Sequence, residues 1–259
     1  MDKNRLRKVL FAAALVLCAA PFVGTAMGLI MGVLFTLLLG NPWPQRSACF
    51  SKLILQLSVV GLGFGLGLGE VIRTGKDSLV YTIIGICCTL ALGYLLGRLL
   101  GTAKNTSALM SFGTAICGGS AIAAMAPVLK AKNDETAVAL ATVFTLNSVA
   151  LLLFPVIGHL IGLDQRLFGT WAGLAIHDTS SVVGACSAYG AQALAVGTTV
   201  KLTRAIWITP VVIGTALYRK SGQKAKLPLF IIGFVLAAAT RTLLPQFGDF
   251  WGELAAIAK

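Results

Sequence analysis

Nine apolar segments separated by short polar breaks dominate this sequence. They fall at about 9–21, 23–40, 53–69, 78–100, 107–129, 136–162, 168–190, 192–217 and 227–245. Most are close to the ~20 residues that a helix needs to cross a hydrocarbon core. Of all residues, 57% are hydrophobic and 12% are charged, whereas soluble domains carry roughly 25% charged residues. We therefore expect an all-α, polytopic membrane protein with roughly seven full spans and a single integral membrane domain over residues 1–259.

The net charge of +12 is interpreted as a signal for membrane orientation, because basic residues gather in the cytoplasmic loops of membrane proteins. We expect no nucleic-acid partner. The basic segment 1–8 and the apolar run after it lack a clear small-residue cleavage site, so we interpret them as a retained first helix and not as a signal peptide. Six cysteines without a CxxC pair predict neither a disulfide framework nor a zinc site, and no cofactor is expected.

Small residues are spaced for close helix packing. Gly93, Gly97 and Gly101 recur at four-residue spacing, and five glycines alternate over 61–69. Such spacing lets helix backbones approach each other. A phosphate-binding loop is the alternative for 61–69, but neither a P-loop lysine nor a strand accompanies it.

Two segments of the sequence resemble each other. Segment 113–122 (GTAICGGSAI) and segment 173–182 (GLAIHDTSSV) share Gly, Ala, Ile and Ser at matched positions with an offset of 60 residues. Each is followed by a further apolar segment. We predict two repeat units, at about 107–162 and 168–217.

Charge placement predicts how these units lie in the membrane. If segment 107–129 crossed fully, Lys130 and Lys132 would lie opposite Lys104, against the positive-inside rule. If the two segments are instead re-entrant hairpins of inverted topology, the basic loops lie on one side of the membrane. Pro21 and Ser221-Gly222 are predicted to separate other membrane spans. The predicted cytoplasmic side then holds 14 of the 21 basic residues: Lys3, Arg5, Arg7, Lys8, Arg46, Lys52, Arg98, Lys104, Lys130, Lys132, Arg219, Lys220, Lys224 and Lys226. Outside lie Arg73, Lys76, Arg166, Arg241 and Lys259.

The polar breaks are the predicted binding site, because an interrupted membrane helix leaves backbone groups that lipid cannot satisfy. The first break contains Cys117, Gly118, Gly119 and Ser120. Its glycines allow an irregular backbone, and amides at a half-helix N-terminus attract anions. A tightly packed helix crossing is the structural alternative.

The second break, 177–181, concentrates His177, Asp178, Thr179 and Ser180 in a chain with only two histidines and nine acids. Ionisable residues inside a membrane mark functional sites by default. Asp178 could bind a coupling cation or exchange a proton, and His177 could donate a hydrogen bond to the substrate. The alternative is that the two residues pair with each other or cap the hairpin.

Lys201 and Arg204 lie nine and twelve residues beyond Gln192, on one face of the predicted helix. Two cations at that depth need an anion, and Asp178 can offset only one of them, which favours a small anionic substrate. A purely structural ion-pair network is the alternative. Asn147, at the matching place on the earlier helix, would add neutral hydrogen bonds.

The segments 111–124, 175–178 (AIHD) and 200–204 (VKLTR) carry a resemblance, over nearly the whole chain, to the YeiH family of sulfate exporters. That family is similar in fold to the sodium/proton antiporter and bile-acid symporter superfamily, so the resemblance implies discontinuous helices that meet near the bilayer midplane. The family has His-Glu where this chain has His177 and Asp178, a shorter carboxylate. Its members also usually continue past residue 259 with further membrane segments.

We therefore expect a secondary transporter, and not an enzyme, that moves a small anion such as sulfate or sulfite by alternating access with H⁺ or Na⁺ coupling. The expected location is the cell inner (plasma) membrane, with a cytoplasmic N-terminus. The alternatives are an intramembrane hydrolase that uses Ser120 or Ser180 with His177, and an anion channel. The sequence leaves the oligomeric state open, a homodimer included.

Overall fold

A computed structural model describes residues 3–18, 23, 25–219 and 229–258. The predicted breaks at Pro21 and Ser221-Gly222, and Lys220, Lys224, Lys226 and Lys259, lie outside the described residues. All regular secondary structure in the described part is helical. The chain divides into two compact units, Met1–Leu57 and Ser58–Lys259, which are described separately.

The first unit contains α1 (Lys3–Cys18), α2 (Thr25–Leu39) and most of α3 (Pro44–Gly63). The predicted turn after residue 40 is stabilised by Asn41. Its Oδ1 accepts a hydrogen bond from the backbone N–H of Trp43 at 2.9 Å, and its Nδ2 donates to Ser47 Oγ at 2.8 Å. Phe11 contacts Phe35 edge to face, with ring centroids 5.6 Å apart, so α1 and α2 pack together.

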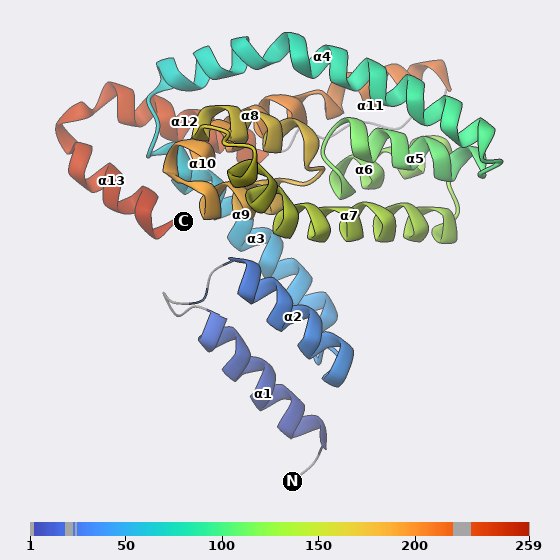
Figure 1. Ribbon diagram of the computed structural model, residues 1–259, viewed down its shortest axis with the longest axis horizontal. Coiled ribbons are helices and arrows are strands. Elements are labelled where there is room, and N and C mark those ends of the chain that lie inside the picture. The colour runs from blue at the N-terminus through green and yellow to red at the C-terminus, as the bar shows by residue number, and fades with distance from the viewer. Residues whose placement is uncertain (1–2, 19–22, 24, 220–228, 259) are drawn as a thin grey trace. The chain divides into compact units, whose positions relative to one another are not determined.

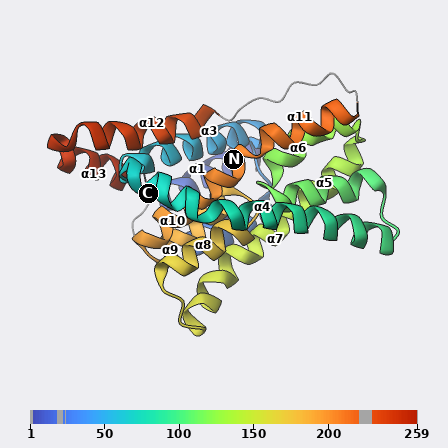
Figure 2. The ribbon, with the colours of Figure 1, turned by 90° about the horizontal axis from the view of Figure 1, so that it is seen from above.

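The second unit begins with the end of α3 and contains the remaining helices (Figure 1). These are α4 (Leu68–Leu99), α5 (Lys104–Ala115), α6 (Gly119–Leu129), α7 (Asn133–Leu160), α8 (Gln165–Ala175), α9 (Thr179–Tyr189), α10 (Ala191–Ile206), α11 (Ile208–Tyr218), α12 (Leu229–Leu243), the short 3₁₀ helix η1 (Pro245–Phe247) and α13 (Gly248–Ile257). In both views, α5 lies beside the C-terminal half of α4, and α8 and α10 lie beside its N-terminal half, whereas α6 packs against α5 (Figures 1 and 2).

The sequence predicts a polar break at Lys76-Asp77, between the apolar segments 53–69 and 78–100, and this prediction is wrong because α4 continues through both residues. Both side chains lie on the exposed side of the helix, where charge does not interrupt backbone hydrogen bonding. Asp77 accepts a hydrogen bond from Arg166 of α8 at 3.1 Å. The charges therefore mark an exposed surface of α4 and not a helix end.

The predicted close packing is confirmed at Gly93, Gly97 and part of the alternating run, but not at Gly67, Gly69 and Gly101, where a Cβ atom would meet nothing within 4 Å. A Cβ atom at Gly93 would lie 2.0 Å from Ser111 Oγ, and one at Gly97 would lie 1.8 Å from Ser107 Oγ. Any larger residue at these two positions would separate α4 from α5. In the alternating run, a Cβ at Gly63 would lie 2.5 Å from the backbone oxygen of Phe234, so α3 also packs closely against α12.

Each predicted repeat segment forms two short helices with a break between them. The second helices, α6 and α9, begin and end at positions exactly matched by the 60-residue offset, since Gly119–Leu129 corresponds to Thr179–Tyr189. In each case, the helix that follows the pair begins beside the start of the pair's first helix. Asn105 of α5 donates to Glu135 of α7 at 3.1 Å, and Gln165 of α8 accepts from the backbone N–H of Gln192 at 2.9 Å.

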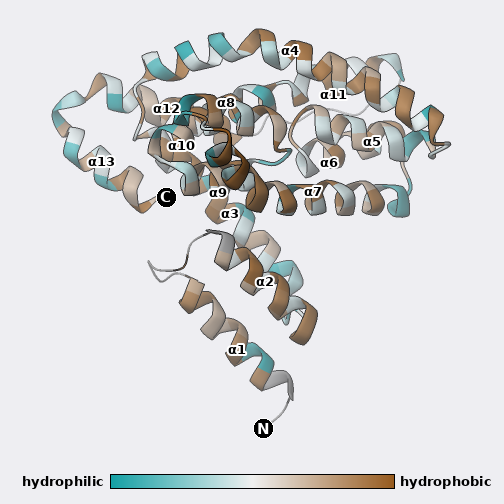
Figure 3. Ribbon diagram, viewed as in Figure 1, coloured by the Kyte–Doolittle hydropathy of each residue, from teal (hydrophilic) through white to brown (hydrophobic). Residues whose placement is uncertain are grey.

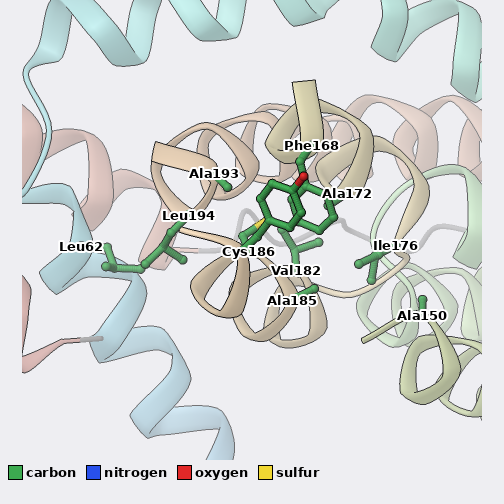
Figure 4. Close-up of a cluster of buried hydrophobic side chains, with 11 residues drawn as sticks. Leu62, Ala150, Phe168, Ala172, Ile176, Val182, Ala185, Cys186, Ala193 and Leu194 are labelled. Carbon is green, nitrogen blue, oxygen red and sulfur yellow. The ribbon is translucent and has the colours of Figure 1, made fainter. Parts of the chain in front are cut away.

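The core of the second pair explains why it folds back on itself. Figure 4 shows side chains of α8, α9 and α10 in one cluster, whose members include Phe168, Ala172, Val182, Cys186 and Ala193. All five are almost fully buried. The ring of Phe168 stacks on that of Tyr189 with centroids 3.7 Å apart. Burial of these apolar side chains holds the two halves of the break in a fixed arrangement.

Three helical stretches of the described residues are long and apolar enough to cross a membrane: α4 (Leu68–Leu99), α7 (Asn133–Leu160) and α10 together with α11 (Ala191–Tyr218). A fourth span is possible if Leu229–Leu243 and Pro245–Ile257, which bend by 99° at their junction, count as one. Figure 3 shows hydrophobic residues along most of α7 and along the C-terminal half of α4. The expected count of roughly seven full spans is not confirmed, because the interrupted helices are individually shorter than the ~20 residues of a span.

Candidate functional site

The two helix breaks contact each other. Gly118 takes φ +64° and ψ −129°, a conformation that glycine adopts and other residues avoid. A Cβ atom at this position would lie 3.4 Å from the backbone of His177 and from the Cβ of Asp178. The glycine thus permits both the irregular backbone and the close approach of the first break to the second.

Lys201 and Arg204 of α10 lie where α5 and α8 end, and both are buried. Lys201 Nζ donates to the backbone oxygens of Ile176 at 2.6 Å and Ile116 at 3.3 Å. Arg204 donates through Nε to Ala115 O at 2.6 Å, through one terminal nitrogen to Thr114 O at 2.9 Å and through the other to Leu174 O. The last turns of α5 and α8 have carbonyls without helical partners, and these two cations satisfy them.

The carbonyls come in pairs that follow the sequence repeat. Lys201 bridges residues 116 and 176, and Arg204 bridges residues 114 and 174. The two residues of each pair lie 60 positions apart in the chain, which is the offset between the two similar segments of the sequence. The C-terminal end of a helix carries about half an elementary negative charge. The cations therefore neutralise two equivalent helix ends and tie the repeats together.

Asp178 caps the start of α9. One carboxylate oxygen accepts from the backbone N–H of Ser181 at 2.9 Å and from Ser180 Oγ at 2.5 Å, and the other accepts from Ser181 Oγ at 2.7 Å. Among the described residues the one ion pair joins Arg166 and Asp77. The alternative that Asp178 caps the hairpin is therefore confirmed, and no ion pair joins it to Lys201 or Arg204, whose described partners are backbone carbonyls.

Asn147 connects α7 to the second break. The residue is almost fully buried, and its Oδ1 accepts a hydrogen bond from the backbone N–H of His177 at 2.9 Å. Within the described part of the chain, Asn147 Nδ2 and His177 Nδ1 are buried without a hydrogen-bond partner. Buried polar groups are rarely left unpaired, so these two nitrogens are available to a ligand or to water.

The start of α6 differs from the start of α9 because its N-cap residue, Gly118, has no side chain to cap the helix, although the Cys117 thiol contacts the backbone N–H of Ala121. The first residues of α6 are Gly119, which is half-buried, and Ser120, which is exposed, while Cys117 just before the helix is buried. Free amides at a helix N-terminus attract anions. On the other break, Thr179 is half-buried and Ser180 is exposed. The structure thus brings both predicted breaks together, with one uncapped helix start.

The charge balance at the breaks is positive. Lys201 and Arg204 supply two cations, whereas Asp178 supplies one carboxylate, which leaves a formal excess of one positive charge. Direct contact between an anion and these cations is limited, because Lys201 is 0% and Arg204 is 4% exposed. Their field acts over a longer range in a medium of low dielectric constant. An anion at the uncapped start of α6 would experience that field.

Sequence reasoning left Ser181 out of the proposed site residues and missed the five carbonyl positions. The spacing Asp178-x-x-Ser181 is that of an N-cap, and it favours the capping alternative. No sequence signal identifies a carbonyl as a partner. The 60-residue repeat is the one sequence feature that could have indicated this contact, since it relates the residues before the first break to those before the second, and so predicts that one cation can contact both repeat units.

Comparisons with known proteins place these features in a family. A family model described as Conserved hypothetical protein 698 matches residues 8–259. A UPF0324 membrane protein of Geobacter sulfurreducens is 68% identical over 259 residues, which cover all of this chain and 84% of the relative. Another from Bdellovibrio bacteriovorus is 48% identical over all of this chain and 82% of its own length, and one from Porphyromonas gingivalis is 52% identical over 88% and 72%. No solved structure matches the chain significantly.

Proposed function

This chain belongs to the Conserved hypothetical protein 698 family of bacterial membrane proteins, and we propose that it is a secondary transporter of a small anion, sulfate-like or sulfite-like. The observation that carries the proposal is the uncapped start of α6 beside two buried cations and one carboxylate. Interrupted helices in a membrane occur where they are buried in protein or line a wet cavity. In transporters such breaks form substrate and ion sites.

In the proposed membrane arrangement, α5–α6 and α8–α9 are re-entrant hairpins that enter from opposite sides. The contacts Asn105–Glu135 and Gln165–Gln192 support this arrangement, because each pair returns to the end where it began. Helix α7 joins the two pairs and is long enough to span a membrane. The excess of basic residues near the first hairpin favours the cytoplasm for its opening, and the inner membrane with a cytoplasmic N-terminus for the whole chain.

Asp178 is the proposed coupling residue. It is the one carboxylate at the breaks, and its two oxygens are held by Ser180 and Ser181. Protonation or Na⁺ binding at this carboxylate would change the net charge felt by the anion by one unit. H⁺ or Na⁺ coupling is thus proposed to act through electrostatics between adjacent helix ends.

The geometry favours transport over intramembrane hydrolysis. A serine hydrolase needs a serine within hydrogen-bond reach of its base. Ser180 donates to Asp178 at 2.5 Å, and Ser120 has no hydrogen bond to His177 among the described contacts. Lys201 and Arg204 also have no role in serine chemistry.

The test uses two substitutions at Ser120 that differ mainly in charge. In Ser120→Asp, a carboxylate at the start of α6 would occupy the proposed anion position, while acids at a helix N-terminus preserve or raise stability. Ser120→Asn has nearly the same shape and no charge. Both variants would be reconstituted in liposomes, and counterflow of radiolabelled sulfate and sulfite would be measured beside the parent.

We expect Ser120→Asp to reduce counterflow at least about tenfold, equivalent to about 1.4 kcal/mol, and Ser120→Asn to stay near the parent. The thermal unfolding midpoint in detergent confirms that both variants fold. Unchanged counterflow in folded Ser120→Asp would place the anion elsewhere and remove the main support for this function.

A further inference from the structure

A row of residues at three-residue spacing runs along α10 from its exposed start toward the buried cations. It consists of Gln192, Ala195, Thr198, Lys201 and Arg204. Residues three apart form a continuous ridge on a helix. Gln192 is exposed, whereas Thr198 is 1% and Lys201 is 0% exposed. With a rise of about 1.5 Å per residue, Thr198 lies about 4.5 Å along the helix axis from Lys201.

Two adjacent cavities lie side by side along the first half of α10, and neither is lined by Lys201 or Arg204. The outer cavity, of about 190 Å³, is lined by the exposed residues Glu70, Arg73, Arg166 and Gln192, among others. The inner cavity, of about 320 Å³, is lined by Thr198, Arg241 and mostly apolar residues. Both cavities are lined by Leu66 and Ala195, so they lie on either side of these two residues.

The polar groups of the inner cavity suit an anion. Arg241 donates one hydrogen bond, to Phe64 O at 2.9 Å, and no carboxylate lines this cavity. The described contacts leave its other guanidinium N–H groups without a protein partner. Thr198 Oγ1 is likewise buried without a hydrogen-bond partner in the described part of the chain. A buried hydroxyl without a partner is costly, unless a ligand or water satisfies it.

We propose that the inner cavity is a second oxyanion-binding site, in which Arg241 and Thr198 hold a sulfate-like ion. Arg241 supplies the charge and directional N–H donors, and Thr198 supplies a neutral donor. The cavity has ample room, since one water occupies about 30 Å³ in the liquid. The ligand class rests on the proposed function, but the site is separate from the start of α6.

The test separates the two sites by placing all variants in the Ser120→Asp background, in which the first site is blocked. Sulfate would be titrated into the purified full chain in lipid nanodiscs by calorimetry. Thr198→Val removes the hydroxyl at nearly constant shape, and Arg241→Gln removes the charge. Thr209→Val is the matched control, because Thr209 Oγ1 is also buried and unpartnered but lines neither cavity.

We expect Ser120→Asp to retain about one sulfate per chain, with affinity lowered at least about tenfold by Thr198→Val or Arg241→Gln and unchanged by Thr209→Val. Absence of sulfate binding in Ser120→Asp would overturn the second site, even if transport is lost as proposed. So would binding that persists equally in both cavity variants. If Arg241→Gln unfolds, Thr198→Val alone decides, since it removes no existing hydrogen bond. Transport in Ser120→Asp tests the proposed function separately.

Discussion

The ammonium group of Lys201 and the guanidinium group of Arg204 donate five hydrogen bonds to backbone carbonyls at the ends of α5 and α8. Their burial and shared helix face could be predicted from the sequence, whereas their partners could not, because any residue supplies a carbonyl. Because Lys201 is 0% and Arg204 is 4% exposed, we propose that they act on an anion through their electric field and not through direct contact. Their first role is to hold the two broken helices together.

Arg204→Lys tests this structural role. An ammonium group cannot reproduce the three-way fork of the guanidinium, so about two carbonyl bonds should be lost. Each hydrogen bond to a charged group contributes roughly 1.5–3 kcal/mol. We expect a clear drop in the thermal unfolding midpoint in detergent.

Arg166→Lys is the control for this substitution. Arg166 forms an exposed ion pair with Asp77, and such pairs contribute about 0–1 kcal/mol. The control should unfold near the parent temperature. If both variants are equally stable, the carbonyl contacts of Arg204 contribute little.

Asp178→Asn separates the cap from the charge at the second break. Asn is about as good an N-cap as Asp, so α9 should remain folded. Loss of the one carboxylate should strengthen equilibrium sulfate binding and abolish dependence of transport on H⁺ or Na⁺ gradients. Calorimetry and liposome uptake with imposed gradients would measure the two effects. Gradient-driven uptake equal to the parent would limit Asp178 to capping.

At the scale of elements, the positions of the helices follow the apolar segments closely, because both depend on where polar residues interrupt the chain. The breaks at residues 116–118 and 176–178 could also be predicted, since glycines and clustered polar residues disfavour a continuous membrane helix. Helix α13 was not predicted, because its ten residues include Asp249 and Glu253 and form no long apolar run. The path of α4 through Lys76 and Asp77 could not be predicted from hydropathy, because charged side chains on the exposed side of a helix lower the hydropathy without interrupting its backbone hydrogen bonds.

Cysteine labelling tests the proposed inversion of the two hairpins. In a background without the exposed Cys49, Cys87 and Cys88, a cysteine at Asn133 should react with an impermeant maleimide from the cytoplasm, and one at Gln165 from outside. A cysteine at Ser221, outside the described residues, should behave like the one at Asn133. Labelling of Asn133 from outside would contradict the arrangement, because both ends of the first hairpin would then change sides.

At the scale of the whole molecule, one family match extends over residues 8–259, and the second unit contains every residue of the proposed sites. The proposed preference for anions rests on the positive excess at the breaks and on Arg241, which lines a cavity without a carboxylate. The central claim is that this charge pattern serves alternating access to a small anion and not a continuous pore.

Exchange in liposomes tests that claim most directly. The purified full chain would be reconstituted, and counterflow and net uptake of sulfate, sulfite, phosphate and small carboxylates would be measured with membrane potential, pH gradient and Na⁺ gradient varied independently. We predict saturable counterflow of sulfate or sulfite, with net uptake responding to a H⁺ or Na⁺ gradient. Absence of counterflow for every anion, or non-saturating conductance that depends only on potential, would contradict the account.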